Sequence, residues 1–403
     1  MKKAVRRASK ETALTQLPIT AEIEVNQKPS LCPKCGATAR LYPAHRKSRT
    51  VYDLRLTATG VRRRVLRYSY RRFYCKMCKG TFQLFNRSKF GPDLRAVCLY
   101  YVMELRVPQV VVGRSIRELF GLPLALNAVQ KMKARGAREY EAMYEDLFKR
   151  ITHGPLLHVD ETKVSIKGKE GFVWVFANLE EVVYIYRSSR EAAFIRDALN
   201  EFHGILISDF YTAYEGISCP QQKCLIHLIR DLNDSLLKEP FNAEIQTLIA
   251  EFSALMKEII ESVDRFGLKS CHLRKHKESV DRFFRALTRR DWKSDGLKTW
   301  RKRFEKNRDT LFTFLDHDGV PWNNNNAEHA VKKFALLRHV IGGSCSEASI
   351  REYLILLSIC ESCSLKGIRF LDFVRSGEAS FEGFLGRRRS ALVGLARQEQ
   401  GDT

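Results

Sequence analysis

The stretch from residue 154 to residue 235 constrains the fold more than any other part of the chain. Short apolar runs alternate there with polar turns, and a longer helical pattern interrupts them. Short apolar runs bounded by turn residues are typical of buried strands. The expected elements, in chain order, are strands at 156–160, 172–178 and 182–187, a helix at 190–202, strands at 204–208 and 219–224, and a helix from about residue 225.

This order of elements predicts an α/β fold of the ribonuclease-H-like class. Residues 236–317 are mostly helical in pattern, rich in charge and without a strand signal, so we predict a helical insertion there. The basic helices expected at 269–308 carry Trp292 and Trp300, and we favour a DNA-guiding surface over a solvated face. The α/β pattern resumes with a helix near Asn326.

Two aspartates stand where we expect strands to end, Asp160 after Leu156–Val159 and Asp209 after Ile205–Ser208. Carboxylates that converge repel one another, and one takes a proton unless divalent cations lie between them. Mg²⁺ prefers such oxygen ligands, and two ions about 4 Å apart can activate an attacking oxygen and stabilise a leaving one. Acidic residues also commonly follow strands as turn formers, so neither aspartate is decisive alone.

Residues 322–328 (WNNNNAE) hold a third acidic candidate, Glu328. The spacing of Asn325 and Glu328 is that of a helix capping box. Four consecutive asparagines exceed what a cap needs, so Asn324 and Asn325 could also contact a nucleic-acid strand. Glu328 could equally be a metal ligand, and the spacing leaves these interpretations open.

The whole chain has a formal net charge of +23, and most of the positive charge lies in its first part. Residues 1–150 carry 32 Lys and Arg against 11 Asp and Glu, whereas the other 253 residues carry 37 against 35. Such a basic region is typical of a part that grips a polyanion, and we favour nucleic acid over an anionic membrane or an acidic protein. No apolar run is long enough to span a membrane, and the basic region lacks an amphipathic anchor.

Cysteine spacing points to a metal site within this basic region. The N-terminus lacks the apolar segment of a secretory signal, so we expect the 11 cysteines to be in a reducing compartment, where paired cysteines favour metal over disulfides. Two Cys-x2-Cys pairs are predicted to close a structural zinc site, with ligands Cys32, Cys35, Cys75 and Cys78. The strand-like sequence at 61–74 suits a basic DNA-contacting ribbon, with candidate contacts Arg62, Arg63, Arg64, Arg67, Arg71 and Arg72.

Three helical patterns follow, at 92–105, 111–120 and 124–150, with breaks at Val107-Pro108 and Gly121-Leu122-Pro123. Three helices with short turns in a basic region predict a helix-turn-helix module.

Cys224 and His227 form a single Cys-x2-His pair, with Arg230 one turn later. Two ligands do not make a zinc site, so we do not expect zinc there. A packed cysteine with a hydrogen-bonded histidine is one interpretation, and an auxiliary catalytic role near the scissile phosphate is the other. The remaining isolated cysteines are predicted to be core residues, namely Cys98, Cys271, Cys345, Cys360 and Cys363.

Taken together, these motifs resemble those of the DDE transposases of bacterial insertion sequences, of the insertion sequence 66 type. The matching motifs, in the family's order, are Asp160-Glu161-Thr162, Trp174-Val175-Phe176, Ser208-Asp209-Phe210-Tyr211-x-x-Tyr214, Cys224-x-x-His227-x-x-Arg230, Asn324-Asn325-x-Ala327-Glu328 and Gly342-Gly343-Ser344. They run from about residue 155 to residue 375, and the basic N-terminal part is similar to the family's DNA-binding region. The chain departs from the family pattern at Asn326, where a basic residue is usual, and at Leu225, where an aromatic residue is common.

The resemblance implies that Asp160, Asp209 and Glu328 form the catalytic triad and bind two Mg²⁺ or Mn²⁺ ions. It implies an enzyme that cleaves transposon ends and joins them to target DNA by two-metal in-line phosphoryl transfer. Two alternatives remain, a related nuclease that does not join strands and a domesticated zinc-ribbon DNA-binding protein. The expected partners are double-stranded DNA and a second copy of the chain, in the bacterial cytoplasm at the nucleoid and without a membrane.

These expectations give a division of the chain into seven parts. They are a flexible basic arm (1–27), a zinc ribbon (28–90), a helix-turn-helix domain (91–152), the first part of the ribonuclease-H-like core (153–235), the helical insertion (236–317), the second part of the core (318–376) and a C-terminal tail (377–403).

Overall fold

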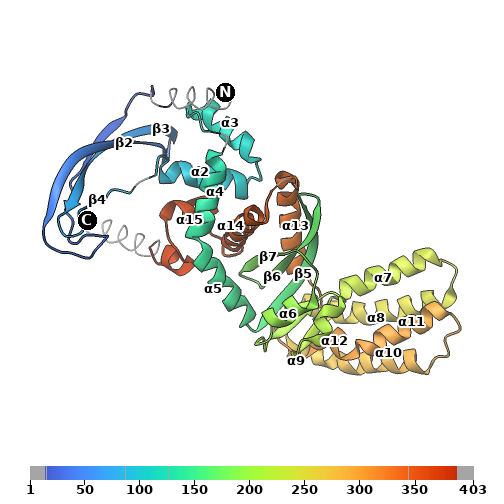
Figure 1. The fold of residues 1–403 in the computed structure, drawn as a ribbon. Helices are drawn as coiled ribbons and strands as arrows, with labels where there is room; N and C mark the ends of the chain where they lie inside the picture. The colour runs from blue at the N-terminus through green and yellow to red at the C-terminus, as the bar shows by residue number, and fades with distance from the viewer. Residues whose placement is uncertain (1–13, 15, 87, 126, 344, 388–403) are drawn as a thin grey trace, which may run out of the picture. The chain divides into compact units, whose positions relative to one another are not determined.

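A computed structural model describes residue 14 and residues 16–86, 88–125, 127–343 and 345–387 (Figure 1). The chain divides into two compact units, one of residues 1–140 with 367–403 and the other of residues 141–366. Most of the predicted basic arm, the end of the predicted tail and Ser344 of the glycine motif lie outside the described residues. No helix in the described part of the chain combines the length and the apolar character that crossing a membrane requires.

The first unit contains a four-stranded sheet built on one long hairpin. Its strands are β1 (Ala21–Val25), β2 (Leu41–Thr57), β3 (Gly60–Cys75) and β4 (Gly80–Gln83). β2 and β3 pair antiparallel along almost their whole length, β1 pairs parallel with the middle of β3, and β4 pairs with its last residues. On one face, Leu66, Tyr68 and Tyr70 pack with Val51 and Phe85 into an apolar cluster.

Strand β1 corrects the prediction of a flexible arm over residues 1–27. Ile23 and Val25 pack against the apolar cluster of the hairpin, so this part of the arm is ordered by burial. The sequence around it is too polar and too short to show a strand by itself, because its apolar residues number only two on the packed face.

Helices α2 (Pro92–Met103), α3 (Gln109–Phe120), α4 (Ala128–Glu139) and α15 (Phe370–Ser376) complete the first unit. Asp53 of β2 accepts a hydrogen bond from the backbone N–H of Leu94 at 2.8 Å, which fixes α2 to the hairpin. The predicted third helix at 124–150 is wrong as a single element. It ends at Glu139, and Tyr140 packs against Phe373 of α15 before α5 (Glu141–Thr152) begins in the second unit.

The second unit contains a five-stranded mixed sheet in the order β7-β6-β5-β8-β9. The strands are β5 (Leu156–Ile166), β6 (Lys169–Ala177), β7 (Val182–Arg187), β8 (Ile205–Ser208) and β9 (Gln221–Lys223). β5, β6 and β7 pair antiparallel in succession, whereas β8 and β9 run parallel to β5. The predicted strands and their order are therefore confirmed, with one correction to the length of β5.

Strand β5 does not end at Asp160 but continues to Ile166, because it forms a tight hairpin with β6. The two turn residues, Lys167 and Gly168, both have positive φ angles, which is the backbone geometry of a two-residue hairpin turn. Asp160 thus lies in the middle of a strand and is held by pairing with β6 on one side.

Segments distant in sequence cover this sheet (Figure 1). Helices α13 (Asn325–Ile341) and α14 (Glu347–Leu365) pack against β5, β6 and β7, as does α5. The backbone N–H groups of Val182 and Tyr184 on β7 donate to the hydroxyl groups of Ser362 and Ser358 on α14. These bonds satisfy donors at the edge of the sheet, which would otherwise be buried without partners. Helix α6 (Ala192–Ala198) and the turn η1 (Thr212–Gly216) lie between strands in sequence.

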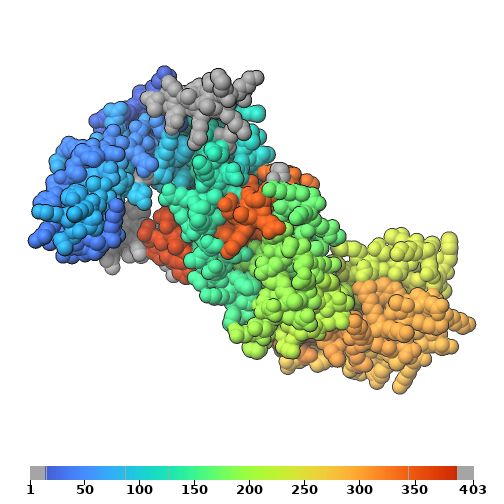
Figure 2. Space-filling view, viewed as in Figure 1, coloured from blue at the N-terminus to red at the C-terminus, as the bar shows by residue number. Residues whose placement is uncertain are grey.

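The chain between β9 and α13 is helical throughout its described elements. These are α7 (Leu225–Lys238), α8 (Ala243–Phe266), α9 (Ser270–Leu273), η2 (Arg274–His276), α10 (Lys277–Arg289), α11 (Asp295–Lys306), α12 (Arg308–Leu311) and η3 (Thr313–Leu315). They pack into one continuous body, coloured yellow to orange in Figure 2. Trp292 and Trp300 are buried in its apolar core, so these tryptophans do not form the DNA-guiding surface that we favoured.

Candidate functional site

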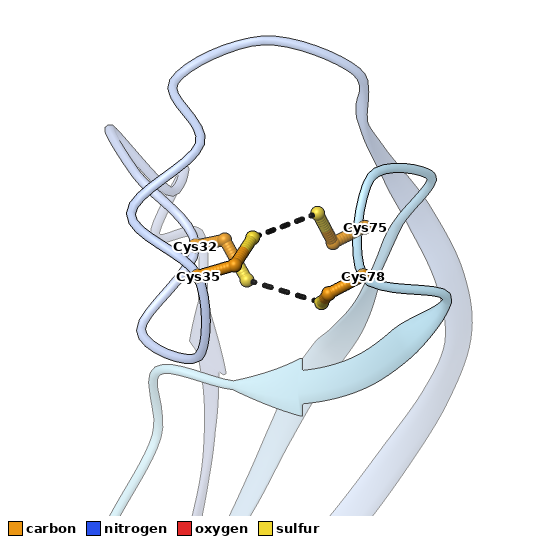
Figure 3. A group of neighbouring side chains, drawn as sticks. All are labelled: Cys32, Cys35, Cys75 and Cys78. Atoms are coloured by element: carbon orange, nitrogen blue, oxygen red, sulfur yellow. Dashed lines mark hydrogen bonds between the residues drawn. The ribbon is translucent and has the colours of Figure 1, made fainter.

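The four paired cysteines meet between the turn that precedes β2 and the turn that joins β3 to β4 (Figure 3). Cys32 Sγ lies 3.8 Å from Cys78 Sγ, and Cys35 Sγ lies 3.7 Å from Cys75 Sγ. Sulfurs bound to one tetrahedral zinc ion at about 2.3 Å are separated by about 3.8 Å. The spacing of the four sulfurs is therefore compatible with a zinc site.

Backbone geometry shapes the first cysteine turn. The N–H of Gly36 donates to the carbonyl of Cys32, and the N–H of Cys32 donates to that of Ala37, with Gly36 in the left-handed region. Desolvation raises the pKa of Cys32, but backbone hydrogen bonds from Lys34 and Cys35 outweigh it and bring this pKa down to about 7. The thiolate is the form that binds metal, and these donors favour it at Cys32, whereas the neighbouring cysteine thiols raise the pKa of Cys35 to about 11.

The two predicted catalytic aspartates come from neighbouring parallel strands. β5 and β8 pair with Leu156 opposite Ile205 and His158 opposite Ile207. Continuing this register by two residues sets Asp160 beside Asp209, directly after the end of β8. Opposed residues of paired strands direct their side chains to the same face. The sheet therefore sets two carboxylates next to each other.

The electrostatics of Asp160 reflect this crowding. Burial is the main cause that raises its pKa to about 7, and repulsion by Glu161, Asp209 and Glu328 adds to it. A hydrogen bond of 2.8 Å from the N–H of Glu161 to Asp160 Oδ1 acts in the opposite direction. Asp160 is thus close enough to Asp209 and to Glu328 for electrostatic repulsion, and two positive groups, Arg190 and the buried Lys223, lie close enough to Asp209 to attract it.

The start of α13 is held against β5 by Asn324, which is fully buried. Its Nδ2 donates to the carbonyl of Val159 at 2.9 Å, and its Oδ1 lies 3.0 Å from Nδ1 of the buried His158. Asn324 therefore has an internal role in place of the DNA contact that the sequence suggested, because its polar atoms are used inside the unit. Asn325 is exposed, and its DNA contact stays a prediction.

Glu328 lies in the first turns of α13 and is not part of a capping box. The helix begins at Asn325, its N-cap is Asn324, and no side-chain cap bond is formed. Glu328 Oε1 is buried and has no hydrogen-bond partner. The capping interpretation is thus excluded, and this carboxylate stays free for another role.

A network around Glu161 was missed by the sequence analysis. The Glu161 side chain is only 4% exposed, pairs with Arg190 and accepts a 2.7 Å hydrogen bond from the hydroxyl of Tyr214. Arg190 stacks on the ring of Tyr211, whose backbone N–H donates to Asp209 Oδ1 at 2.9 Å. The network ties β5 to the loop that carries Asp209. The family motifs contain Glu161, Tyr211 and Tyr214, but their spacing does not show that they touch.

Of the auxiliary candidates, the structure brings Cys224 and His227 together with Glu328. Cys224 is the buried N-cap of α7, and His227 lies in the first turn of that helix. One ligand atom from each of these three residues lies within 4.8 Å of the others. Among the described residues, two groups of three or more His, Cys, Asp or Glu residues meet this distance, namely this group and the four cysteines. The set of Asp160, Asp209 and Glu328 does not meet it. Arg230 is exposed and is not in the group.

The candidate DNA-contacting arginines of β3 differ in how available they are. Arg62, Arg67 and Arg71 are exposed, although Arg67 pairs with Glu22. Arg63 donates to the carbonyls of Phe120 and Gly121 at 3.4 Å, and Arg72 donates to the hydroxyl of Thr81. Arg64 is half-buried.

The register of the hairpin reveals a candidate that the sequence analysis missed. Arg55 of β2 is exposed and stands opposite Arg62, whereas Arg46, which stands opposite Arg71, pairs with Glu24. Like charges directly opposite each other destabilise a sheet. This arrangement therefore favours an anionic partner on that part of the hairpin.

Among the remaining cysteines, Cys98, Cys360 and Cys363 are buried as predicted, but Cys271 is exposed and Cys345 is only half-buried.

The model of a family described as Transposase IS66 family matches residues 87–351. That range contains Asp160, Asp209 and Glu328 but not the four paired cysteines. No curated protein matches the chain.

Proposed function

The chain belongs to the IS66 transposase family, and from that premise we propose that it cleaves the ends of a mobile DNA element and joins them to target DNA. Family membership makes it a DNA-processing enzyme and implies DNA binding and the use of a divalent metal. The finer parts of the proposal are the catalytic residues, the two-step chemistry and the domains that carry them.

The strand order of the second unit supports a ribonuclease-H-like core. Three antiparallel strands are followed by two parallel ones, with the helical segment between β9 and α13. We assign the core to residues 153–235 and 318–376 and the helical insertion to 236–317. In the first unit, the cysteine site supports a zinc ribbon at 28–90, and α2, α3 and α4 support the helix-turn-helix domain predicted at 91–152, of which residues 141–152 lie in the second unit.

The proposal rests on the register of β5 and β8, which brings Asp160 opposite Asp209 when it is continued by two residues, and on the repulsion between Glu328 and Asp160. Burial and repulsion by neighbouring carboxylates raise the pKa of Asp160 to about 7, and a bound cation would offset both effects. Carboxylate oxygens are the ligands that Mg²⁺ prefers. The donor set of Asp160, Asp209 and Glu328 therefore fits divalent cations.

Bound Mg²⁺ or Mn²⁺ would neutralise the charge that develops on phosphate oxygens during an in-line displacement. In the first step, water attacks a phosphodiester at the element end, and the leaving oxygen takes a proton to become a free 3′-OH. In the second step, that 3′-OH attacks a phosphodiester of the target, forms a new bond to phosphorus and releases a target 3′-OH. Neither step needs a side-chain nucleophile, so the proposed role of the three acidic residues is to hold the divalent cations and to position them at the reacting phosphate.

Two features support the positions of these groups. Asn324 fixes the start of α13 to β5 beside Asp160, and the Glu161 network fixes the loop of Asp209. Residues that orient metal ligands usually matter nearly as much as the ligands. We propose that Asn324 and Glu161 are positioning residues.

DNA binding is proposed for exposed arginines of the hairpin, namely the pair Arg55 and Arg62 and, farther along β3, Arg71. Each phosphate that such residues neutralise releases counterions, so the affinity for DNA should fall steeply with salt. Because two element ends must be brought together, we propose that the protein acts as a homodimer on DNA at the bacterial nucleoid.

The test is an end-cleavage assay with the full chain, Mg²⁺ and duplexes that carry the terminal inverted repeats flanking the gene. Glu328→Gln should abolish cleavage while DNA binding persists. Asp197→Asn, at an exposed carboxylate of α6, is the matched control and should cleave normally. Full cleavage by Glu328→Gln would overturn the catalytic assignment. A pre-cut end separates the remaining alternatives, because a nuclease without joining activity would give no strand-transfer product.

A further inference from the structure

Three side chains with different ligand chemistry meet where the start of α7 approaches the start of α13. Sγ of Cys224, a ring nitrogen of His227 and a carboxylate oxygen of Glu328 lie within 4.8 Å of one another. The spacing of Cys224 and His227 showed only two ligands, and the third comes from a helix that follows the whole helical segment. The sequence showed two candidate ligands, which are too few for a zinc site. In the structure, Glu328 is the third.

The contacts within this group are not those of a hydrogen-bonded pair. His227 Nδ1 lies 3.7 Å from Glu328 Oε1, which is beyond hydrogen-bonding distance. Both atoms are buried and have no hydrogen-bond partner. Buried polar atoms without hydrogen-bond partners destabilise the folded state. Two such atoms that face each other therefore indicate a bound ion that both of them contact.

The separations fit a metal ion in that position. Two ligands held at about 2.0–2.1 Å from a tetrahedral zinc ion lie about 3.4 Å apart, and those that include a sulfur lie somewhat farther apart. The observed 3.7 Å between nitrogen and oxygen needs only a small contraction. The three ligands would leave one position open, as in zinc sites with an exchangeable water.

Three backbone N–H groups surround the sulfur of Cys224, although burial outweighs them and raises the pKa of this thiol. Sγ accepts a hydrogen bond of 3.2 Å from the N–H of Asn324 and receives the backbone N–H groups of Ile226 and His227 at the N-terminus of α7. Backbone donors and a helix N-terminus stabilise negative charge on sulfur. A thiol that only fills space in a core does not need three donors.

We propose that Cys224, His227 and Glu328 form a second zinc site, chemically distinct from the Mg²⁺ site of the triad. Thiolate and imidazole select zinc over magnesium, which prefers oxygen ligands alone. Glu328 approaches His227 through Oε1, which leaves Oε2 for the triad. The inference goes beyond the proposed function and does not depend on it, because it needs only the placement of these three side chains.

The experiment is a count of zinc per chain in the purified full-length protein, by native mass spectrometry and by elemental analysis. The wild type should hold two zinc ions, one at the four cysteines and one at this site. Cys224→Ser and His227→Ala should each hold one. Cys98→Ser, which removes another buried thiol outside both groups, should still hold two. Millimolar Mg²⁺ should not lower the wild-type count.

A wild type with one zinc ion would overturn the proposal, as would two ions that persist in both variants. The wild-type count needs no substitution, and His227 is partly exposed, so its variant should fold even if Cys224→Ser does not. Circular dichroism checks folding. Asp160→Asn should lose Mg²⁺-dependent cleavage yet keep two zinc ions, so a failure of the catalytic proposal and a failure of this one give different results.

Discussion

The two regions with metal-ligating side chains are built in opposite ways. In the first unit, each turn supplies two cysteines, and the turns are joined by a single long hairpin. In the second unit, the acidic and auxiliary residues come from β5, the loop after β8, α7 and α13. The cysteine site can be recognised from spacing, whereas the acidic site exists only once the sheet register and the helical segment are in place. The predictions below probe this difference.

The largest effect is expected at the four-cysteine site, because metal binding to its two turns would be coupled to folding and the apolar cluster beside them is small. Cys32→Ser should abolish zinc binding there and cost on the order of 10 kcal/mol of zinc-linked folding free energy. Hydrogen exchange should show the loss of protection in residues 28–90. Cys98→Ser is the matched control with a buried thiol and should keep that protection. Unchanged protection in Cys32→Ser would mean that the turns are stable without metal.

In the acidic site the chemistry should fail while the fold survives. Asp160→Asn removes one of several like charges, so the protein should be as stable as the wild type or more stable. End cleavage should fall by about a thousand-fold or more, as when a main electrostatic stabiliser is removed. Thermal unfolding and a gel-based cleavage assay measure the two quantities. If Asp160→Asn lost both stability and cleavage activity, this residue would be needed for the fold as well as for the chemistry, which contradicts the prediction.

Strands β5 to β8 of the second sheet could be predicted from apolar runs bounded by turn residues, whereas β9 is the polar sequence Gln221–Lys223 and has no such run. The cysteine site could be predicted because its ligands are local in sequence. The meeting of Glu328 with Cys224 and His227 could not, since it depends on the path of the helical segment. Likewise, the break at Tyr140 depends on the distant Phe373, and β1 depends on a cluster formed by other strands.

The asparagine run shows the same limit in a single segment. Neighbouring Asn324 and Asn325 have the same side chain, yet one is buried and the other exposed. Asn324→Ala should cost about 2 kcal/mol or more of unfolding free energy, because His158 and Val159 lose their partner. Cleavage should fall about 10- to 100-fold through misplacement of α13.

Asn325→Ala is the matched control for that substitution and should leave stability within about 0.5 kcal/mol. Chemical denaturation and cleavage rates distinguish the two variants. Equal losses in both would show that the run acts as a unit and that burial does not separate its members.

The smallest effect is expected on the hairpin, where function and stability should move in opposite directions. Arg55 and Arg62 face each other, so Arg62→Gln relieves a repulsion and should leave the melting temperature unchanged or slightly higher. The same change should weaken DNA binding several-fold and reduce the slope of log affinity against log salt by about 1. Arg301→Gln, at an arginine of α11 paired with Glu305, should not change that slope. If Arg62→Gln lowered stability and left the salt slope intact, the facing arginines would be structural, and the DNA-binding surface would have to lie elsewhere in the protein.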